Sequence, residues 1–185
     1  PAGYGALHAG GVLHFAAADL DRTGHSAGGD RDFAKQIVAE GYAALVIEQR
    51  GFGSRKSERE LRGNPDANTT CTHPALVASL MGRTFLGERI FDLSCAIDML
   101  EHFPMIDRER IGLMGNSGGG TATYYAACMD ERIKIAMPSC SVCTYKHSIT
   151  ARTHCACNYI PGIAKYVDMG ELACLIAPSK LIVVA

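Results

Sequence analysis

Two segments of this 185-residue chain place a serine in the spacing Gly-x-Ser-x-Gly, which is compatible with nucleophilic catalysis. Ser26 lies in the segment 24–28, and Ser117 lies in the segment 115–119. A serine on a tight turn between a strand and a helix exposes its hydroxyl for attack on a carbonyl. The backbone N–H after that serine then faces the oxyanion that develops. Glycines two positions before and after the serine allow the close backbone approach that such a turn requires.

The sequence around each serine separates the two candidates. Ser117 directly follows the apolar segment 111–114, which predicts a strand, and directly precedes a predicted helix over 118–129. Ser26 follows the polar segment 19–23, which does not resemble a strand. The context therefore predicts Ser117 as the nucleophile. The alternatives for Ser117 are an unreactive serine in a glycine-rich turn or a phosphate-binding turn, and the latter is disfavoured because no Lys-Ser/Thr pair follows the glycines.

Short apolar runs alternate with helical periods along the chain, which indicates the α/β class with a parallel sheet covered by helices. The predicted strands are residues 11–18, 43–48, 111–114, 133–138 and 181–185. Two other helices are predicted. The first has Asp30 as its N-cap and ends before Gly41, and the second runs from 86 to 101. The run at 43–48 is continuously apolar, which predicts a strand buried on both faces. Residues 50–82 are expected to be irregular, and residues 139–177 are mixed and rich in cysteine.

The composition excludes several classes of partner. Lys plus Arg number 18 and Asp plus Glu number 19, so we expect no nucleic-acid partner and no binding to an anionic membrane surface. No apolar run reaches the roughly 18–20 residues that cross a bilayer. With eight cysteines and no visible signal peptide, we expect reduced thiols and a cytoplasmic location.

Two central segments carry a family resemblance. Residues 83–92 (RTFLGERIFD) and 107–120 (DRERIGLMGNSGGG) resemble acetyl xylan esterase-like members of the α/β-hydrolases, which are related to dienelactone hydrolase. Residues 50–54 (RGFGS) resemble a turn of that family, and residues 176–184 resemble its seventh strand. The resemblance implies a partial α/β-hydrolase fold, with a mostly parallel five-stranded sheet and helices on both faces. The predicted strands would lie side by side in the order second, first, third, fourth, fifth.

The resemblance also implies roles for individual residues. The backbone N–H groups of Gly118 and His25 would form the oxyanion hole, so the segment 24–29 that contains Ser26 is better interpreted as the oxyanion loop. The side chain of His25 is expected to form a wall of the site rather than to act as a base.

In this family the acid follows the seventh strand and the histidine follows the eighth, whereas this chain reaches its last residue within the seventh. We therefore expect a single, truncated domain over 1–185 that lacks both groups. After Ser117 the aspartates and histidines are Asp130, Asp168, His147 and His154, and none of them fits the family's order and position.

The implied activity is that of a serine esterase (a carboxylic ester hydrolase) that removes small acyl groups, acetyl above all, from carbohydrate-like esters. The substrate is a small-molecule ester, no cofactor and no metal are needed, and this chain alone is expected to be weak or inactive. Two alternatives stay open. One is a non-catalytic fragment that associates into a homo-oligomer through its sheet edges. The other is a zinc-binding module with the ligands Cys140, Cys143, His154, Cys155 and Cys157.

Overall fold

The computed structural model describes residues 9–16, 33–65, 67 and 69–185, and these residues form one five-stranded parallel sheet. The strands are β1 (Ala9–Ala16), β2 (Ala43–Glu48), β3 (Ile106–Asn116), β4 (Ile133–Ser139) and β5 (Lys180–Leu181). Their spatial order is β2-β1-β3-β4-β5. This is the order that the family resemblance predicts, so the chain reverses direction across the sheet between β2 and β3.

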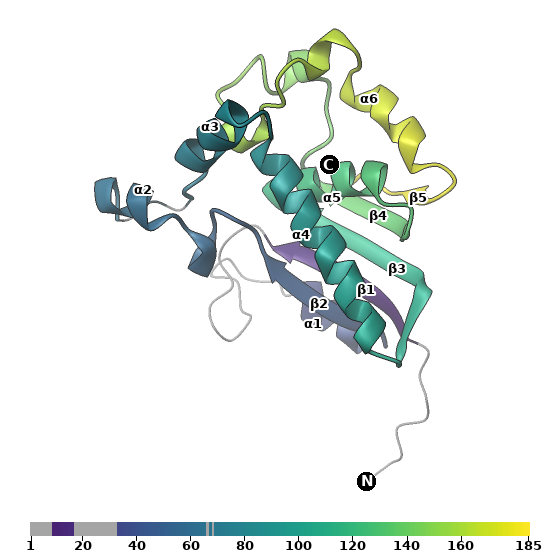
Figure 1. Ribbon diagram of the computed structural model, residues 1–185. Coiled ribbons are helices and arrows are strands. Elements are labelled where there is room, and N and C mark those ends of the chain that lie inside the picture. Colours follow the sequence, from purple (N-terminus) through teal and green to yellow (C-terminus); the bar gives the residue numbers. More distant parts are fainter. Residues whose placement is uncertain (1–8, 17–32, 66, 68) are drawn as a thin grey trace.

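Helices cover both faces of the sheet, as predicted (Figure 1). The α-helices are α1 (Phe33–Ala39), α2 (Glu58–Gly63), α3 (Thr72–Leu80), α4 (Phe85–Met99), α5 (Gly118–Met129) and α6 (Met169–Leu172). α1 packs on β1 and β2, whereas α4 and α5 contact each other over the opposite face. Right-handed crossovers give this result, because the chain moves one way along the sheet through α1 and the other way through α4 and α5.

Short 3-10 helices account for much of the remaining chain. They are η1 (Gly53–Arg55), η2 (Leu100–His102), η3 (Tyr145–His147), η4 (Ala156–Asn158), η5 (Ile163–Lys165) and η6 (Ala173–Ile176). In the described part of the chain, no helix is long and apolar enough to span a bilayer.

The main core lies between the sheet and the pair α4–α5. Leu86, Leu93 and Ile97 lie at helical spacing on α4 and are at most 3% exposed. They belong to one cluster with the strand residues Leu113 and Ile133. Burial of one such side chain stabilises a fold by about 1.5–3 kcal/mol, so this layer fixes where α5 begins. A second, smaller cluster joins α3, the start of α4 and η4.

Three predictions about the elements need correction. The side chains of β2, which lies at the edge of the described sheet as the predicted order requires, are half-exposed instead of buried on both faces. Residues 50–82 contain α2 and α3 and are not mostly irregular. The fifth strand is shorter than expected, although backbone hydrogen bonds from Ile182 to Ala136 and from Val184 to Pro138 continue the parallel pairing beyond it.

Candidate active site

Ser117 occupies the junction between β3 and α5 in a strained backbone conformation. Its φ is 53° and its ψ is −117°, and such a conformation costs a non-glycine residue on the order of 1–3 kcal/mol. The surrounding backbone holds the turn from two sides. The Ser117 N–H donates to the Ser139 carbonyl at the end of β4, and the Thr121 N–H donates to the Ser117 carbonyl, each at 2.9 Å. The side chain of Ser117 is exposed.

Two glycines allow α5 to lie directly against the strand ends. A Cβ at Gly115 would lie 2.4 Å from both the carbonyl carbon and the carbonyl oxygen of Gly119. A Cβ at Gly120 would lie 2.5 Å from the Ser139 carbonyl oxygen. These contacts involve backbone atoms, which cannot rotate away as side chains can. Glycine at positions 115 and 120 is therefore a packing requirement of this turn.

The backbone N–H of Gly118 is the first of α5 and points away from the helix body. In the described residues, no carbonyl or side chain accepts a hydrogen bond from it. A free N–H at the positive end of a helix is suited to bind an oxyanion. The second predicted donor, His25, lies outside the described residues, as does Ser26.

A cavity of about 240 Å³ opens beside Ser117. Its lining comes from the start of α5, the segment after β4, the segment 148–158, α6 and the last three residues. The lining residues are Ser117, Gly118, Thr121, Tyr125, Cys140, Ser141, Val142, Cys143, Ser148, Ile149, His154, Asn158, Met169, Val183, Val184 and Ala185. The sequence reasoning missed most of these residues. The general rule that ligands bind beyond the carboxyl ends of parallel strands pointed to the segment after β4.

The acidic residues after Ser117 do not reach this cavity. Asp130 follows the far end of α5 and accepts hydrogen bonds from Arg132 at 2.6 and 2.9 Å. Those hydrogen bonds hold the pKa of Asp130 below its usual value, so it is a paired carboxylate. Asp168 caps α6 and accepts from the N–H groups of Met169 and Tyr145.

The two histidines of this region lie differently. His147 belongs to η3, and its Nδ1 is 2.7 Å from the Thr144 hydroxyl. His154 lines the cavity that contains Ser117. Within the part of the chain that the structure describes, however, no group forms a hydrogen bond with the Ser117 hydroxyl. Among the described residues, therefore, none is hydrogen-bonded to Ser117 as a general base would be.

The five proposed zinc ligands do not come together. Cys140, Cys143 and His154 line the Ser117 cavity, whereas Cys155 and Cys157 lie with Cys71 in a separate group. Ser117 and Cys140 are the two non-glycine residues with positive φ in the described chain. All eight cysteines are free thiols.

An arginine–carboxylate network fixes the turn after β2 against α4. Arg50 donates to both oxygens of Asp92, at 2.7 and 2.8 Å, and to Glu88 at 3.1 Å. Arg55 adds a contact to Asp92 at 2.9 Å. Burial opposes ionisation of Asp92, but the two guanidinium groups outweigh it and leave the pKa below its usual value. Residues 50–54 therefore form a braced turn.

The fold and the strained serine turn define an α/β-hydrolase. Residues 23–167 match the family model of acetyl xylan esterase (AXE1), so the chain belongs to the acetyl xylan esterase family.

Relatives and solved structures agree with this assignment. "Putative hydrolase YtaP" of Bacillus subtilis is 28% identical over 151 residues, which are 79% of this chain and 46% of that protein. The crystal structure of a "putative acetyl xylan esterase" from Bacteroides fragilis has a TM-score of 0.77 at 15% identity, over 95% of this chain and 51% of that one. A glucuronoyl esterase from Solibacter usitatus has a TM-score of 0.65 at 20% identity, over 95% of this chain and 55% of that one. The chain thus spans about half the length of these proteins, and the structural likenesses show the fold alone.

Proposed function

We propose that this chain carries the nucleophile and one oxyanion donor of a serine esterase that cleaves small acyl groups, acetyl in particular, from carbohydrate-like esters. The observation that carries the proposal is the backbone of Ser117, strained to φ 53° at the point where β3 meets α5. Strain of this kind persists only where the surrounding structure enforces it, and it is concentrated at active sites. Membership of the acetyl xylan esterase family supports the choice of ester and acyl group.

The chemistry follows from the geometry. The Ser117 hydroxyl attacks the ester carbonyl, and the oxygen of the tetrahedral intermediate accepts a hydrogen bond from the Gly118 N–H. The base takes the Ser117 proton during the attack, and it passes this proton to the alcohol as the C–O bond to the alcohol breaks. Water hydrolyses the acyl-serine and restores the hydroxyl. We propose His25 as the second oxyanion donor, through its backbone N–H.

The size of the cavity supports a small acyl group. Its volume of about 240 Å³ lies below the roughly 300–1,000 Å³ typical of sites for drug-sized ligands. Its walls are largely apolar, with Val142, Ile149 and Met169 among the lining residues. An acetyl methyl group fits such walls, whereas the polar alcohol part of the ester would remain towards solvent.

We further propose that the general base and its acid are supplied from outside these 185 residues, so that this chain alone is weak or inactive. Loss of the base and acid of a triad removes several orders of magnitude of rate and leaves a residual rate from the oxyanion hole and binding. The eight free thiols support a reducing compartment, and we propose the cytoplasm.

Labelling by a fluorophosphonate tests both parts of the proposal. We expect slow modification of Ser117, detected by peptide mass spectrometry, and acceleration by added imidazole as an external base. Ser117→Ala should abolish the label. Ser148→Ala is the matched control, because Ser148 lines the same cavity and its hydroxyl donates to the Thr144 carbonyl. Equal labelling of Ser117→Ala and the wild-type chain would refute the nucleophile, and fast labelling without imidazole would refute the missing base.

A second proposal concerns association of the chain with itself. β5 is an edge strand, and the residues after it expose apolar side chains: Ile182 is 44% exposed, Val183 50% and Val184 39%. An exposed apolar edge can pair with another chain. Sedimentation at rising concentration should show oligomers, and Val183→Lys should abolish them. Val77→Lys, at a 40% exposed site on α3, should not. A monomer at every concentration contradicts this proposal.

A further inference from the structure

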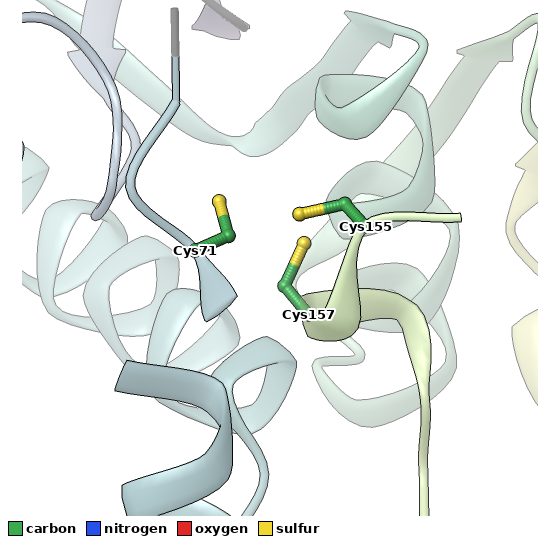
Figure 2. Close-up of side chains that lie close together, drawn as sticks. All are labelled: Cys71, Cys155 and Cys157. Atoms are coloured by element: carbon green, nitrogen blue, oxygen red, sulfur yellow. The ribbon is translucent and has the colours of Figure 1, made fainter. Parts of the chain in front are cut away.

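Three thiols from distant parts of the sequence converge at one point of the fold. Cys71 lies directly before α3, whereas Cys155 and Cys157 lie at the start and within η4. Figure 2 shows their sulfur atoms pointing toward one another. All three sulfurs are within 4.8 Å of one another. Cys71 and Cys157 are buried, and Cys155 is half-buried, which leaves a route from solvent to the cluster.

A buried arginine lies against this thiol cluster. Arg89 of α4 is 1% exposed, and it donates to the Cys71 and Cys157 sulfurs at 3.1 Å each. Its other hydrogen bonds are to the Arg50 carbonyl, at 2.7 and 3.2 Å. Among the described residues, no carboxylate lies within ion-pair distance of this guanidinium.

The charge of Arg89 needs compensation from the thiol cluster. Its guanidinium carbon lies 5.2 Å from the ring centre of Phe52 and 4.8 Å from that of Phe85, which helps but supplies no negative charge. A buried cation without an anionic partner is strongly destabilising. The sulfurs are the groups within reach that can become anionic, so the cluster is more than a set of small apolar side chains.

We propose that Cys71, Cys155 and Cys157 bind one zinc ion as thiolates, with Arg89 balancing the charge of the complex. Zn–S bonds of about 2.3 Å in a tetrahedral site place sulfurs about 3.8 Å apart, so the cluster has to contract by at most about 1 Å. Binding displaces to solvent the protons of those thiols that are not yet ionised. A water molecule or an added ligand would take the fourth position.

The charges favour zinc over another thiophilic ion. Three thiolates and Zn²⁺ carry a net charge of −1, which the guanidinium of Arg89 neutralises. Copper(I) in the same three thiolates would carry −2 and leave one negative charge buried without a partner. A disulfide would use two of the three sulfurs and leave the third, together with Arg89, without a role. The zinc site is separate from the proposed esterase chemistry and does not depend on it.

Zinc titration of the reduced, metal-free chain against a chromogenic chelator tests the proposal. We expect one equivalent of zinc to bind and the melting temperature to rise on binding. Cys71→Ser, Cys155→Ser and Cys157→Ser should each weaken binding at least tenfold. Cys95→Ser is the control for a lone exposed thiol, and Cys140→Ser/Cys143→Ser controls for the other close pair; both should bind as the wild-type chain does.

Co²⁺ provides a second measurement, because thiolate-to-metal charge-transfer bands report sulfur ligation directly. These bands should be present in the wild-type chain and reduced in each of the three ligand variants. Should a ligand variant fail to fold, the wild-type bands and the zinc-dependent melting temperature still decide. The proposal is overturned if the wild-type chain shows neither the charge-transfer bands with Co²⁺ nor a rise in melting temperature with zinc. It is also overturned if Cys140→Ser/Cys143→Ser removes binding while Cys71→Ser retains it.

Discussion

Gly115→Ala is the sharpest test of how α5 is seated beside Ser117. The new Cβ would lie 2.4 Å from the Gly119 carbonyl carbon and oxygen, and ordinary contact begins at 3.4 Å. The start of α5 must therefore move by about 1 Å, and overpacking of this kind costs about 1–3 kcal/mol. The gain from replacing a glycine in a strand offsets about 0.5–1 kcal/mol. We expect a net loss of about 1 kcal/mol.

The assay is urea unfolding followed by far-ultraviolet circular dichroism, together with thermal melting. For a chain of this length, a loss of about 1 kcal/mol lowers the melting temperature by about 2–4 °C. Gly170→Ala in α6 is the control, because a Cβ there meets nothing within 4 Å, and it should be neutral or stabilising. The displaced Gly118 N–H should also slow fluorophosphonate labelling of Ser117. If Gly115→Ala is as stable as Gly170→Ala, the close-approach argument is wrong.

Two further predictions concern contacts that brace the site. Asp92→Asn should cost about 1 kcal/mol, because it removes the charge that Arg50 and Arg55 share. Since the folded-state pKa of Asp92 is lowered, this stabilisation is present above about pH 4 and is lost as the pH falls through the folded pKa. The free energies of unfolding of the variant and the wild type should therefore converge as the pH is lowered. If the difference in free energy of unfolding between Asp92→Asn and the wild type is the same at low pH, the ion pairs of Asp92 are not its source. Tyr125→Phe should lower the free energy of unfolding in urea by about 1–3 kcal/mol, because the Tyr125 hydroxyl is 2.5 Å from that of buried Tyr145. The double variant Tyr125→Phe/Tyr145→Phe should lose less than twice as much.

The elements predicted most accurately are those whose ends are marked by residues adjacent in the sequence. α5 runs from Gly118 to Met129 and β2 from Ala43 to Glu48, both as predicted, because glycine punctuation and apolar runs mark their ends. The helix α3 was missed, because residues 50–82 were expected to be irregular. Pro74 lies in the first turn of that helix, where a missing N–H costs nothing.

Contacts between distant segments were beyond a sequence-based prediction. The zinc hypothesis grouped cysteines that are close in sequence, but Cys140 and Cys143 face one cavity, and Cys155 and Cys157 meet Cys71 in another place. The partial exposure of β2 was missed as well, because its continuous apolar run alone suggested burial on both faces. The role of Ser117 as nucleophile stays a prediction, as does that of His25, and labelling is the test.

The segment around η4 has two sides. His154 and Asn158 line the Ser117 cavity, while Cys155 and Cys157 between them belong to the thiol cluster. We expect a ligand that stiffens one side of so short a segment to alter the free energy of binding on the other. Thermodynamic linkage then requires the influence to be mutual: if zinc tightens an acyl-site ligand by some factor, that ligand tightens zinc by the same factor. Zinc affinities measured before and after phosphonylation of Ser117 would give that factor directly, and equal affinities would mean that the two sides act independently.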